Sequence, residues 1–259
     1  MSAAIHPTAT VAPSAKVAHD VTIGAYAIIN ERVEIGAGSF VGPFSILGEP
    51  TSDFYSNSAQ PPAWCRIGAN ALIRSHSVIY AGAEIGADFK CGHRVTIREG
   101  SVIGSDCRVG TLSDLQGNLR IGSHVRLHSS VHIGMFSVIE DFAWVFPYVV
   151  LTNDPHPPSD TCTRGPTVRR LAVIATHSVL MPGITVGEGA LVGAMSLVNR
   201  DVPPETLVVG VPARPAGSVR DIRCEDGRLP QLYPWPYHFR RGYPPEAAKE
   251  LLRIAGAEE

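Results

Sequence analysis

Aliphatic residues recur at every sixth position over most of the chain, in three successive registers. The longest register runs from Ile67 to Leu151, and each of its positions is apolar. An N-terminal register runs from Ile5 to Leu47, and a third resumes near Ile174. A period of six fits neither a helix, which repeats every 3.6 residues, nor a simply alternating strand. It fits short strands that each turn a corner around a prism, with three strands in a coil of 18 residues.

The residues that follow each aliphatic position support this interpretation. The next residue is often glycine, and the fourth residue after the aliphatic one is usually small, as at Ala71, Ser77 and Ala190. We expect the aliphatic side chain to fill the axis of the prism and the small one to occupy the cramped corner. Residues 18 apart should therefore stack at strand spacing, which is about 4.8 Å.

Two segments rich in turn-forming residues interrupt the period and shift its register. They span about residues 48–66 and 152–170, and each is too long to be a rung, so both should loop out of the prism. Residues 1–214 are predicted to form the β-helix domain with these two loops. Residues 215–259 are predicted to form a C-terminal extension, because the stretch from about Arg220 contains no hexads.

The end of this extension has the pattern of a short helix. The segment PPEAAKELLRIAGAEE predicts a helix that begins at Pro244 or Pro245. We expect this helix to cover the open end of the β-helix, because the last rung would otherwise leave an unpaired sheet edge.

The composition indicates a soluble protein that acts on small molecules or other proteins. The 259 residues are 44% apolar, which is enough for a sizeable core. A formal net charge of −2 does not favour binding to nucleic acid or to an anionic membrane. The five cysteines form no Cys-x-x-Cys pair, so reduced thiols are expected. The N-terminal MSAAIHPTAT lacks a signal-peptide pattern, and no apolar run is long enough to span a bilayer. We therefore expect a cytoplasmic protein.

The hexapeptide pattern resembles that of the hexapeptide-repeat acyltransferases over roughly Ile5 to Arg214. The resemblance implies an all-β fold, a left-handed parallel β-helix, although the general rule for β-crossovers would give the opposite hand. The stretch from Leu180 to Arg214 is similar to the family's C-terminal signature and ends in Gly-Val-Pro-Ala-Arg. One prism face offers no enclosed pocket, whereas clefts between parallel prisms do, so we expect a homotrimer with active sites between subunits.

The same resemblance implies acetyl-CoA as the acyl donor, bound in a groove between neighbouring subunits. Gly193, Ala194 and Met195 would then lie beside the pantetheine arm of CoA. Arg200 or Arg214 would meet the CoA phosphates, since a guanidinium can donate two parallel hydrogen bonds to a phosphate.

Two further stretches resemble enzymes that acetylate amino sugars. Leu151 to His156, followed by a proline-rich loop, is similar to a motif of N-acetyltransferases that act on nucleotide-linked amino sugars. Ile73 to Glu99 is similar to long-form members that act on dTDP-linked sugars. The resemblance implies CoA-dependent N-acetylation of a dTDP- or UDP-linked 3- or 4-amino-deoxysugar. The substrate-binding candidates are Asn153, Asp154, His156, Arg98 and Tyr80.

An amine that attacks a thioester needs a group to accept its proton, and a histidine or carboxylate suits this role. His93 and His128 are candidates because an unperturbed imidazole, with a pKa of about 6.5, exchanges protons near neutrality. Asp88 is expected to orient His93 from round a corner, and Glu99 is a candidate proton relay or contact of the amine.

Polar residues replace glycine at several repeat positions in the middle of the chain, which predicts a functional cleft at the central rungs. They are Arg74, Tyr80, Arg98, Gln116, His128 and Glu140. His128 lies 18 residues before Phe146, on a column that leads toward the second loop. We expect it near Asn153 and Asp154 of its own chain or of a neighbour's.

Other interpretations stay open at this stage. Asn153, Asp154 and His156 suit loop capping by Asx turns, and Asp106 and His124, 18 residues apart, suit a structural pair. The acceptor could be a hydroxyl, the donor an acyl carrier protein, or the base dispensable if the amine loses its proton to solvent or substrate. A γ-carbonic anhydrase would hold zinc between subunits, but the histidines lack the spacing expected for it, so no metal is expected.

Overall fold

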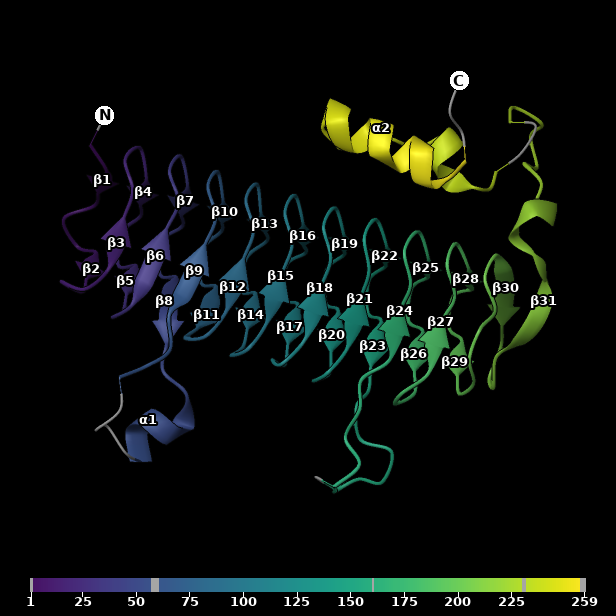
Figure 1. The fold of residues 1–259 in the computed structure, drawn as a ribbon, viewed down its shortest axis with the longest axis horizontal. Helices are drawn as coiled ribbons and strands as arrows, with labels where there is room; N and C mark the ends of the chain where they lie inside the picture. Colours follow the sequence, from purple (N-terminus) through teal and green to yellow (C-terminus); the bar gives the residue numbers. More distant parts are fainter. Residues whose placement is uncertain (1, 57–60, 160, 230–231, 257–259) are drawn as a thin grey trace.

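The computed structural model describes residues 2–56, 61–159, 161–229 and 232–256. The chain winds into a left-handed parallel β-helix, a three-sided prism whose strands are mostly two residues long (Figure 1). The all-β fold class expected from the period of six is confirmed. Each rung, meaning one turn of the prism, adds one strand to each of three sheets, which we call faces 1, 2 and 3.

The strands of one face are hydrogen-bonded in the order of the rungs. Face 1 contains β1 (Ala4–Ile5), β4 (Thr22–Ile23), β7 (Phe40–Val41), β10 (Leu72–Ile73), β13 (Lys90–Cys91), β16 (Arg108–Val109), β19 (Arg126–Leu127), β22 (Trp144–Val145), β25 (Val173–Ile174), β28 (Leu191–Val192), β30 (Thr206–Val209) and β31 (Arg214–Ser218). Face 2 contains β2 (Thr10–Val11), β5 (Ile28–Ile29), β8 (Ile46–Glu49), β11 (Val78–Tyr80), β14 (Thr96–Ile97), β17 (Asp114–Leu115), β20 (His132–Ile133), β23 (Val150–Leu151), β26 (Val179–Leu180) and β29 (Leu197–Val198). Face 3 contains β3 (Lys16–Val17), β6 (Val33–Ile35), β9 (Cys65–Ile67), β12 (Glu84–Ile85), β15 (Val102–Ile103), β18 (Arg120–Ile121), β21 (Val138–Ile139), β24 (Thr167–Val168) and β27 (Thr185–Val186).

Residues 18 apart stack inside the prism, as the period predicted. In face 1, Ile73 pairs with Cys91 and Cys91 pairs with Val109, in parallel register. These side chains are 0%, 2% and 3% exposed. Burying one aliphatic side chain contributes roughly 1.5–3 kcal/mol, and every face repeats the column. The prism is therefore held together from inside, and the neighbouring residue of each strand faces outward and is free to serve other roles.

The turns between strands form three edges. We call the turns from face 1 to face 2 the first edge, those from face 2 to face 3 the second edge, and those from face 3 to face 1 the third edge. Many turns hold a non-glycine residue at positive φ, three positions after the core residue, as at Tyr148 (φ 61°) and Met195 (φ 58°) on the first edge. Both side chains are exposed, so an edge presents a column of outward side chains at rung spacing.

Both extruded segments leave the prism at the second edge (Figure 1). The first lies between β8 and β9 and contains α1 (Ser52–Ser56), and the second lies between β23 and β24. The second segment ends at Pro166, earlier than the sequence indicated, because the next two residues pair with both β21 and β27. The period already resumes at Val168, six residues before Ile174.

The C-terminal extension folds back along the prism instead of covering its open end. β31, which starts at the predicted domain boundary, closes that end by pairing antiparallel with β30, and η1 (Val219–Asp221) follows it. The chain then returns beside the middle rungs through η2 (Trp235–Tyr237) to α2 (Pro245–Ile254) (Figure 1). The predicted helix is confirmed, but its expected position over the last rung was wrong.

The packing of α2 explains its position. Ala247 and Leu251 are buried against Phe142, Leu171 and Tyr243, so the apolar side of the helix is matched by an apolar patch at the third edge. At the end of face 1, by contrast, β31 already occupies the edge of the sheet. No helix within the described ranges is long and apolar enough to cross a membrane.

Candidate functional site

His128 lies on the first edge, next to face 1, in an aromatic setting. Its ring stacks on Phe146 with 4.6 Å between ring centroids and an interplanar angle of 14°, and the centroid of the Trp144 ring lies 5.7 Å away. The imidazole is half-buried, and burial lowers the pKa of His128 below its usual value. The ring is therefore neutral at pH 7 and able to accept a proton.

A groove of about 440 Å³ runs along face 1, and His128 is part of its lining. We call it the face 1 groove, and its polar and aromatic lining includes Arg74, Lys90, Arg108, Arg126, His128, Trp144 and Arg241. All but Arg241 come from successive rungs, and Arg241 comes from the C-terminal extension. The groove is therefore strongly basic and is open to solvent beside a neutral imidazole.

His93 also lies on the first edge, and its side chain is exposed. It belongs to a column of residues 18 apart that reads Ser75, His93, Thr111 and Ser129, so it lies two rungs before the turn that holds His128. Nδ1 of His93 lies 2.8 Å from Oγ of Ser75, and the backbone N–H of His93 donates to Oγ1 of Thr111. His93 is therefore held by its neighbouring rungs on both sides.

Asp88 does not orient His93, contrary to the sequence-based expectation. Asp88 lies on the third edge, where its Oδ1 accepts a hydrogen bond of 3.1 Å from Nδ2 of Asn70 on the preceding rung. The expectation was wrong because a single hexad carries the chain from one edge of the prism to the next. The two residues are close in sequence but lie on different edges.

Tyr80, Arg98 and Glu99 come together on the second edge. Nε and Nη2 of Arg98 donate to the two carboxylate oxygens of Glu99, at 3.1 and 2.8 Å, and the guanidinium lies 5.6 Å from the centre of the Tyr80 ring. A hollow of about 510 Å³ between this edge and the first loop is lined in part by Phe54 and Glu99. Within the chain, the charge of Glu99 is thus already matched by Arg98.

The second loop uses its polar residues for its own structure. Oδ1 of Asp154 accepts from the backbone N–H of His156, and Oδ2 accepts from that of Ser159, both at 2.8 Å. The carbonyl of Asn153 accepts from the backbone N–H of Arg164 at 2.8 Å. This is the Asx-turn capping that the sequence left open. The imidazole of His156 is exposed.

The loop and His128 do not meet within one chain. The loop leaves at the second edge, whereas His128 lies on the first, so the expected proximity to Asn153 and Asp154 of the same chain was wrong. The six polar residues at glycine positions are similarly divided among the three edges, and the single central cleft expected from them is not formed within the described chain. Arg74 and His128 alone among them line the face 1 groove.

The residues assigned to CoA lie toward the last rungs. Gly193, Ala194 and Met195 are on the first edge, three rungs beyond His128, which corresponds to about 14 Å at strand spacing. Arg214 pairs with Val209, the residue whose Cγ1 would lie 2.7 Å from a Cβ at position 193. The first edge therefore carries both His128 and this group.

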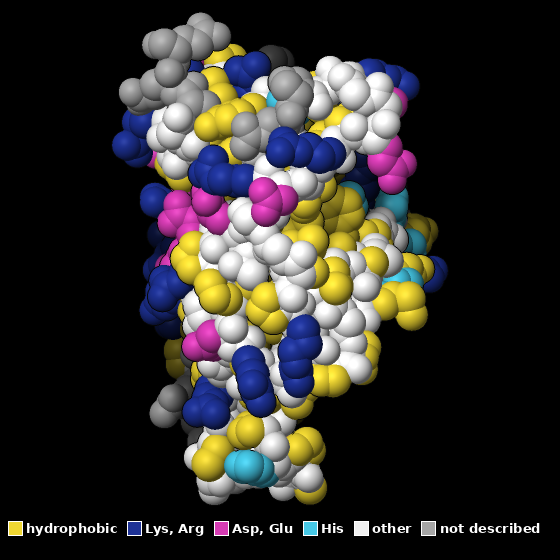
Figure 2. Space-filling model, turned by 90° about the vertical axis from the view of Figure 1, so that its right-hand side faces the viewer, with side chains coloured by type: hydrophobic (Ala, Val, Ile, Leu, Met, Phe, Trp, Pro, Cys, Tyr) yellow, Lys and Arg dark blue, Asp and Glu magenta, His cyan; other side chains and the backbone are white. Residues whose placement is uncertain are grey.

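Arg200 is separate from that group. It follows β29 and is exposed near the second edge. Several Lys and Arg side chains are exposed on the molecular face that includes the last rungs (Figure 2). Within the described residues, no group of three or more His, Cys, Asp or Glu side chains is placed to hold a metal ion.

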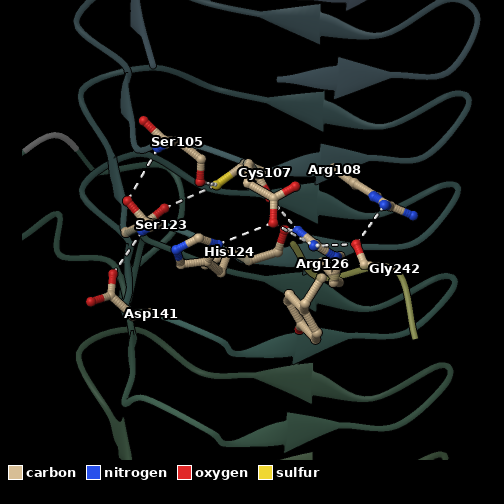
Figure 3. Close-up of polar contacts among 12 residues, drawn as sticks. Ser105, Cys107, Arg108, Ser123, His124, Arg126, Asp141 and Gly242 are labelled. Atoms are coloured by element: carbon tan, nitrogen blue, oxygen red, sulfur yellow. Dashed lines mark hydrogen bonds and ion pairs between the residues drawn. The ribbon is translucent and has the colours of Figure 1, made fainter. Parts of the chain in front are cut away.

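Asp106 and His124 pair across adjacent rungs, as their spacing of 18 predicted. Nδ1 of His124 lies 3.0 Å from Oδ2 of Asp106, and Nη2 of Arg126 lies 2.7 Å from the same oxygen (Figure 3). Burial alone would raise the pKa of Asp106, but the hydrogen bonds from His124 and Arg126 outweigh it and lower the pKa. Arg126 also donates to the carbonyl of Gly242, which ties the C-terminal extension to face 1.

Comparison with known proteins identifies the repeat. Residues 14–49 match the family model of the bacterial transferase hexapeptide (six repeats). The acyl-(acyl-carrier-protein)–UDP-N-acetylglucosamine O-acyltransferase of Saccharophagus degradans is 35% identical over 144 residues, which cover 52% of this chain and 47% of that protein. Residues 14–49 therefore carry the hexapeptide repeat of bacterial transferases, and the chain is similar to acyltransferases with this repeat.

Two other comparisons concern part of the sequence and the fold. The chain is 26% identical to galactoside O-acetyltransferase of Escherichia coli over 114 residues, 36% of this chain and 56% of that protein. Its fold is similar to that of the Arabidopsis UDP-N-acetylglucosamine acyltransferase, with a TM-score of 0.59 and 18% identity over 98% of this chain and 77% of that one. The chain spans about half the length of the two curated relatives.

Most of the residues that line the face 1 groove were not predicted from the sequence. Lys90, Arg108 and Arg126 are 18 residues apart and occupy the outward position of successive strands, so the period itself could have revealed them as one column. No comparable signal exists for Arg241, because its place depends on how the C-terminal extension folds back.

Proposed function

We propose that the protein is a CoA-dependent acyltransferase that acetylates the amino group of a nucleotide-linked amino-deoxysugar beside His128. The observation that carries the proposal is a neutral, half-buried imidazole on the edge that also carries Gly193 to Met195. Similarity to transferases with the hexapeptide repeat supports transfer of an acyl group, and the relatives named above are an O-acyltransferase of UDP-N-acetylglucosamine and a galactoside O-acetyltransferase.

In the proposed reaction the amine nitrogen attacks the carbonyl carbon of the acetyl thioester. The new C–N bond forms, the tetrahedral intermediate collapses, and the C–S bond breaks with CoA leaving as its thiolate. His128 takes the proton that the attacking nitrogen loses and passes it to the thiolate sulfur. No covalent bond to the protein is needed.

We further propose a homotrimer in which the first edge faces a neighbouring subunit. Exposed apolar side chains recur along this edge at Tyr26, Phe44, Leu112, Tyr148 and Met195. Exposed apolar side chains grouped on one edge favour contact with another protein surface. A neighbour there would supply the second wall that a flat prism face lacks, and its second loop could bring Asn153 and Asp154 to His128.

A thiol-release assay with acetyl-CoA tests the reaction. The acceptors are dTDP- and UDP-linked 3- and 4-amino sugars, with hydroxyl sugars of matched structure as controls. Release with one amino sugar supports N-acetylation and names the acceptor. No release with any acceptor, although CoA binds, contradicts acetyl transfer to an amino sugar.

A second candidate is O-acylation of a sugar. It is favoured by the two relatives described above, whose names specify O-acyl and O-acetyl transfer. Release in the same assay with a hydroxyl sugar, and not with its amino counterpart, would select it.

The role of His128 is tested separately with His128→Asn. We expect kcat/KM to fall by roughly 10²-fold or more, which is typical of losing a general base. Because the pKa of His128 is lowered, the acid limb of the wild-type kcat/KM profile should lie below about pH 6.5 and disappear in the variant. His19→Asn is the matched control, because His19 is an exposed histidine on the third edge. This variant should leave the rate within about twofold.

If His128→Asn keeps the wild-type rate and pH profile, His128 is not the base. The substrate-assisted route, in which the amine loses its proton without a protein side chain, would then account for turnover.

A further inference from the structure

Face 1 carries three stacked cations in consecutive rungs. Lys90 pairs in register with Arg108, and Arg108 with Arg126, so their outward side chains follow one another at rung spacing. Like charges directly opposite each other destabilise a sheet. Such a column therefore calls for a negative group close by.

Among the described residues, Arg126 is the only cation of this column that has a carboxylate close by. Asp106 pairs with it at 2.7 Å and also with His124, which leaves that carboxylate engaged. No carboxylate of the described chain forms an ion pair with Lys90, Arg108 or Arg74. The face 1 groove thus has a surplus of positive charge that the described part of the protein does not neutralise.

The C-terminal extension holds one of these cations in place. Nη2 of Arg108 donates to the carbonyl of Gly242 at 2.7 Å, and Nε of Arg108 is buried without a hydrogen-bond partner among the described residues. Gly242 has a φ of +85°, and a Cβ there would lie 3.1 Å from Nη1 of Arg108. The guanidinium is therefore fixed at the groove with donors to spare.

We propose that the face 1 groove is a diphosphate-binding site. Cations repeated at about 4.8 Å along one column offer separate partners to two linked phosphoryl groups. Arg74 and Arg241 extend the positive field on either side of this column. A volume of about 440 Å³ accommodates a diphosphate together with the group attached to it.

His128 lines the same groove as the column of cations. A group linked to a diphosphate bound at this column would therefore lie in the groove that also contains the imidazole. Both substrates of the proposed reaction contain a diphosphate, the nucleotide-linked sugar and CoA. This use of the site rests on the proposed function, but binding of a diphosphate does not require turnover.

The test is a binding measurement by titration calorimetry on the full chain. The probes are inorganic pyrophosphate, UDP, dTDP and CoA, with uridine and thymidine as controls without phosphate. The variants are Arg74→Gln and Lys90→Gln, alone and combined, because both side chains are exposed and neither forms an ion pair within the described chain. Arg120→Gln, an exposed arginine at the outward position of β18 on face 3, is the matched control.

We expect the combined variant to weaken pyrophosphate binding roughly tenfold or more and to reduce its salt dependence, whereas Arg120→Gln stays within about twofold. A matching loss for UDP or dTDP assigns the groove to the acceptor, and a matching loss for CoA assigns it to the donor. The proposal is overturned if the combined variant binds every diphosphate probe as tightly as the wild type does. It is also overturned if Arg120→Gln weakens binding as much as the combined variant. Because the experiment measures binding and not turnover, its result does not depend on whether an amino sugar is acetylated.

Discussion

Faces 1 and 3 are built from the same repeat, but their outward charges are arranged in opposite ways. On face 3, Lys16, Glu34, Arg66 and Glu84 follow one another in register, so the charges alternate. Nη1 of Arg66 lies 2.9 Å from Oε1 of Glu84. On face 1 the corresponding column is a run of cations. The charges of this column on face 3 therefore balance one another, whereas those on face 1 depend on groups from elsewhere.

The difference shows what the inward and outward positions of the repeat each control. The inward aliphatic columns are alike on both faces and hold the prism together. The outward columns do not affect that packing, so they can carry different charges. On face 1, Arg126 pairs with Asp106 at the third edge and lies over the ring of Tyr243, and Arg108 donates to the carbonyl of Gly242. Tyr243 and Gly242 belong to the C-terminal extension.

The largest effect is expected from Arg126→Ala on face 1. The Arg126 side chain is 5% exposed and pairs with Asp106, and its guanidinium lies 4.2 Å from the centre of the Tyr243 ring. Removing it leaves a buried carboxylate with less compensation, which should lower the free energy of unfolding by about 3–5 kcal/mol. Urea unfolding at pH 7 measures this. A loss below about 1 kcal/mol would show that face 1 does not depend on this pair.

An intermediate effect on the free energy of unfolding is expected when the pH is lowered. The pKa of Asp106 is lowered in the folded protein, so its stabilising contribution is complete above about pH 3.9, the unfolded value, and is lost as the pH falls through the folded pKa. The free energy of unfolding should therefore decline over this acidic window. Asp106→Asn should flatten the decline, and a variant with an unchanged slope would place the dependence on other groups.

The smallest effect is expected from Arg66→Ala on face 3. The side chains of this ion pair are 51% and 52% exposed, so solvent screens the interaction. The free energy of unfolding should change by no more than about 1 kcal/mol. A loss as large as that of Arg126→Ala would remove the distinction between the two faces.

The candidate site was predicted only in part from the sequence. His128 was singled out because it replaces glycine in the repeat, and the structure gives it a lowered pKa beside a basic groove. The pairing of His93 with Asp88 was wrong, because closeness in sequence does not place two residues on the same edge. The roles of Gly193 to Met195, Arg200 and Arg214 toward CoA stay predictions.

The period of six by itself determined the prism and the stacking of residues 18 apart, and the pattern of the last residues determined the existence of α2. They could do so because a local pattern of apolar residues decides which side chains each short element turns inward. Only the tertiary structure decided where the C-terminal extension lies, and with it the place of Arg241 and Gly242 beside Arg108. That position depends on contacts between segments more than 100 residues apart, such as Arg108 and Gly242, and no repeat in the sequence encodes them.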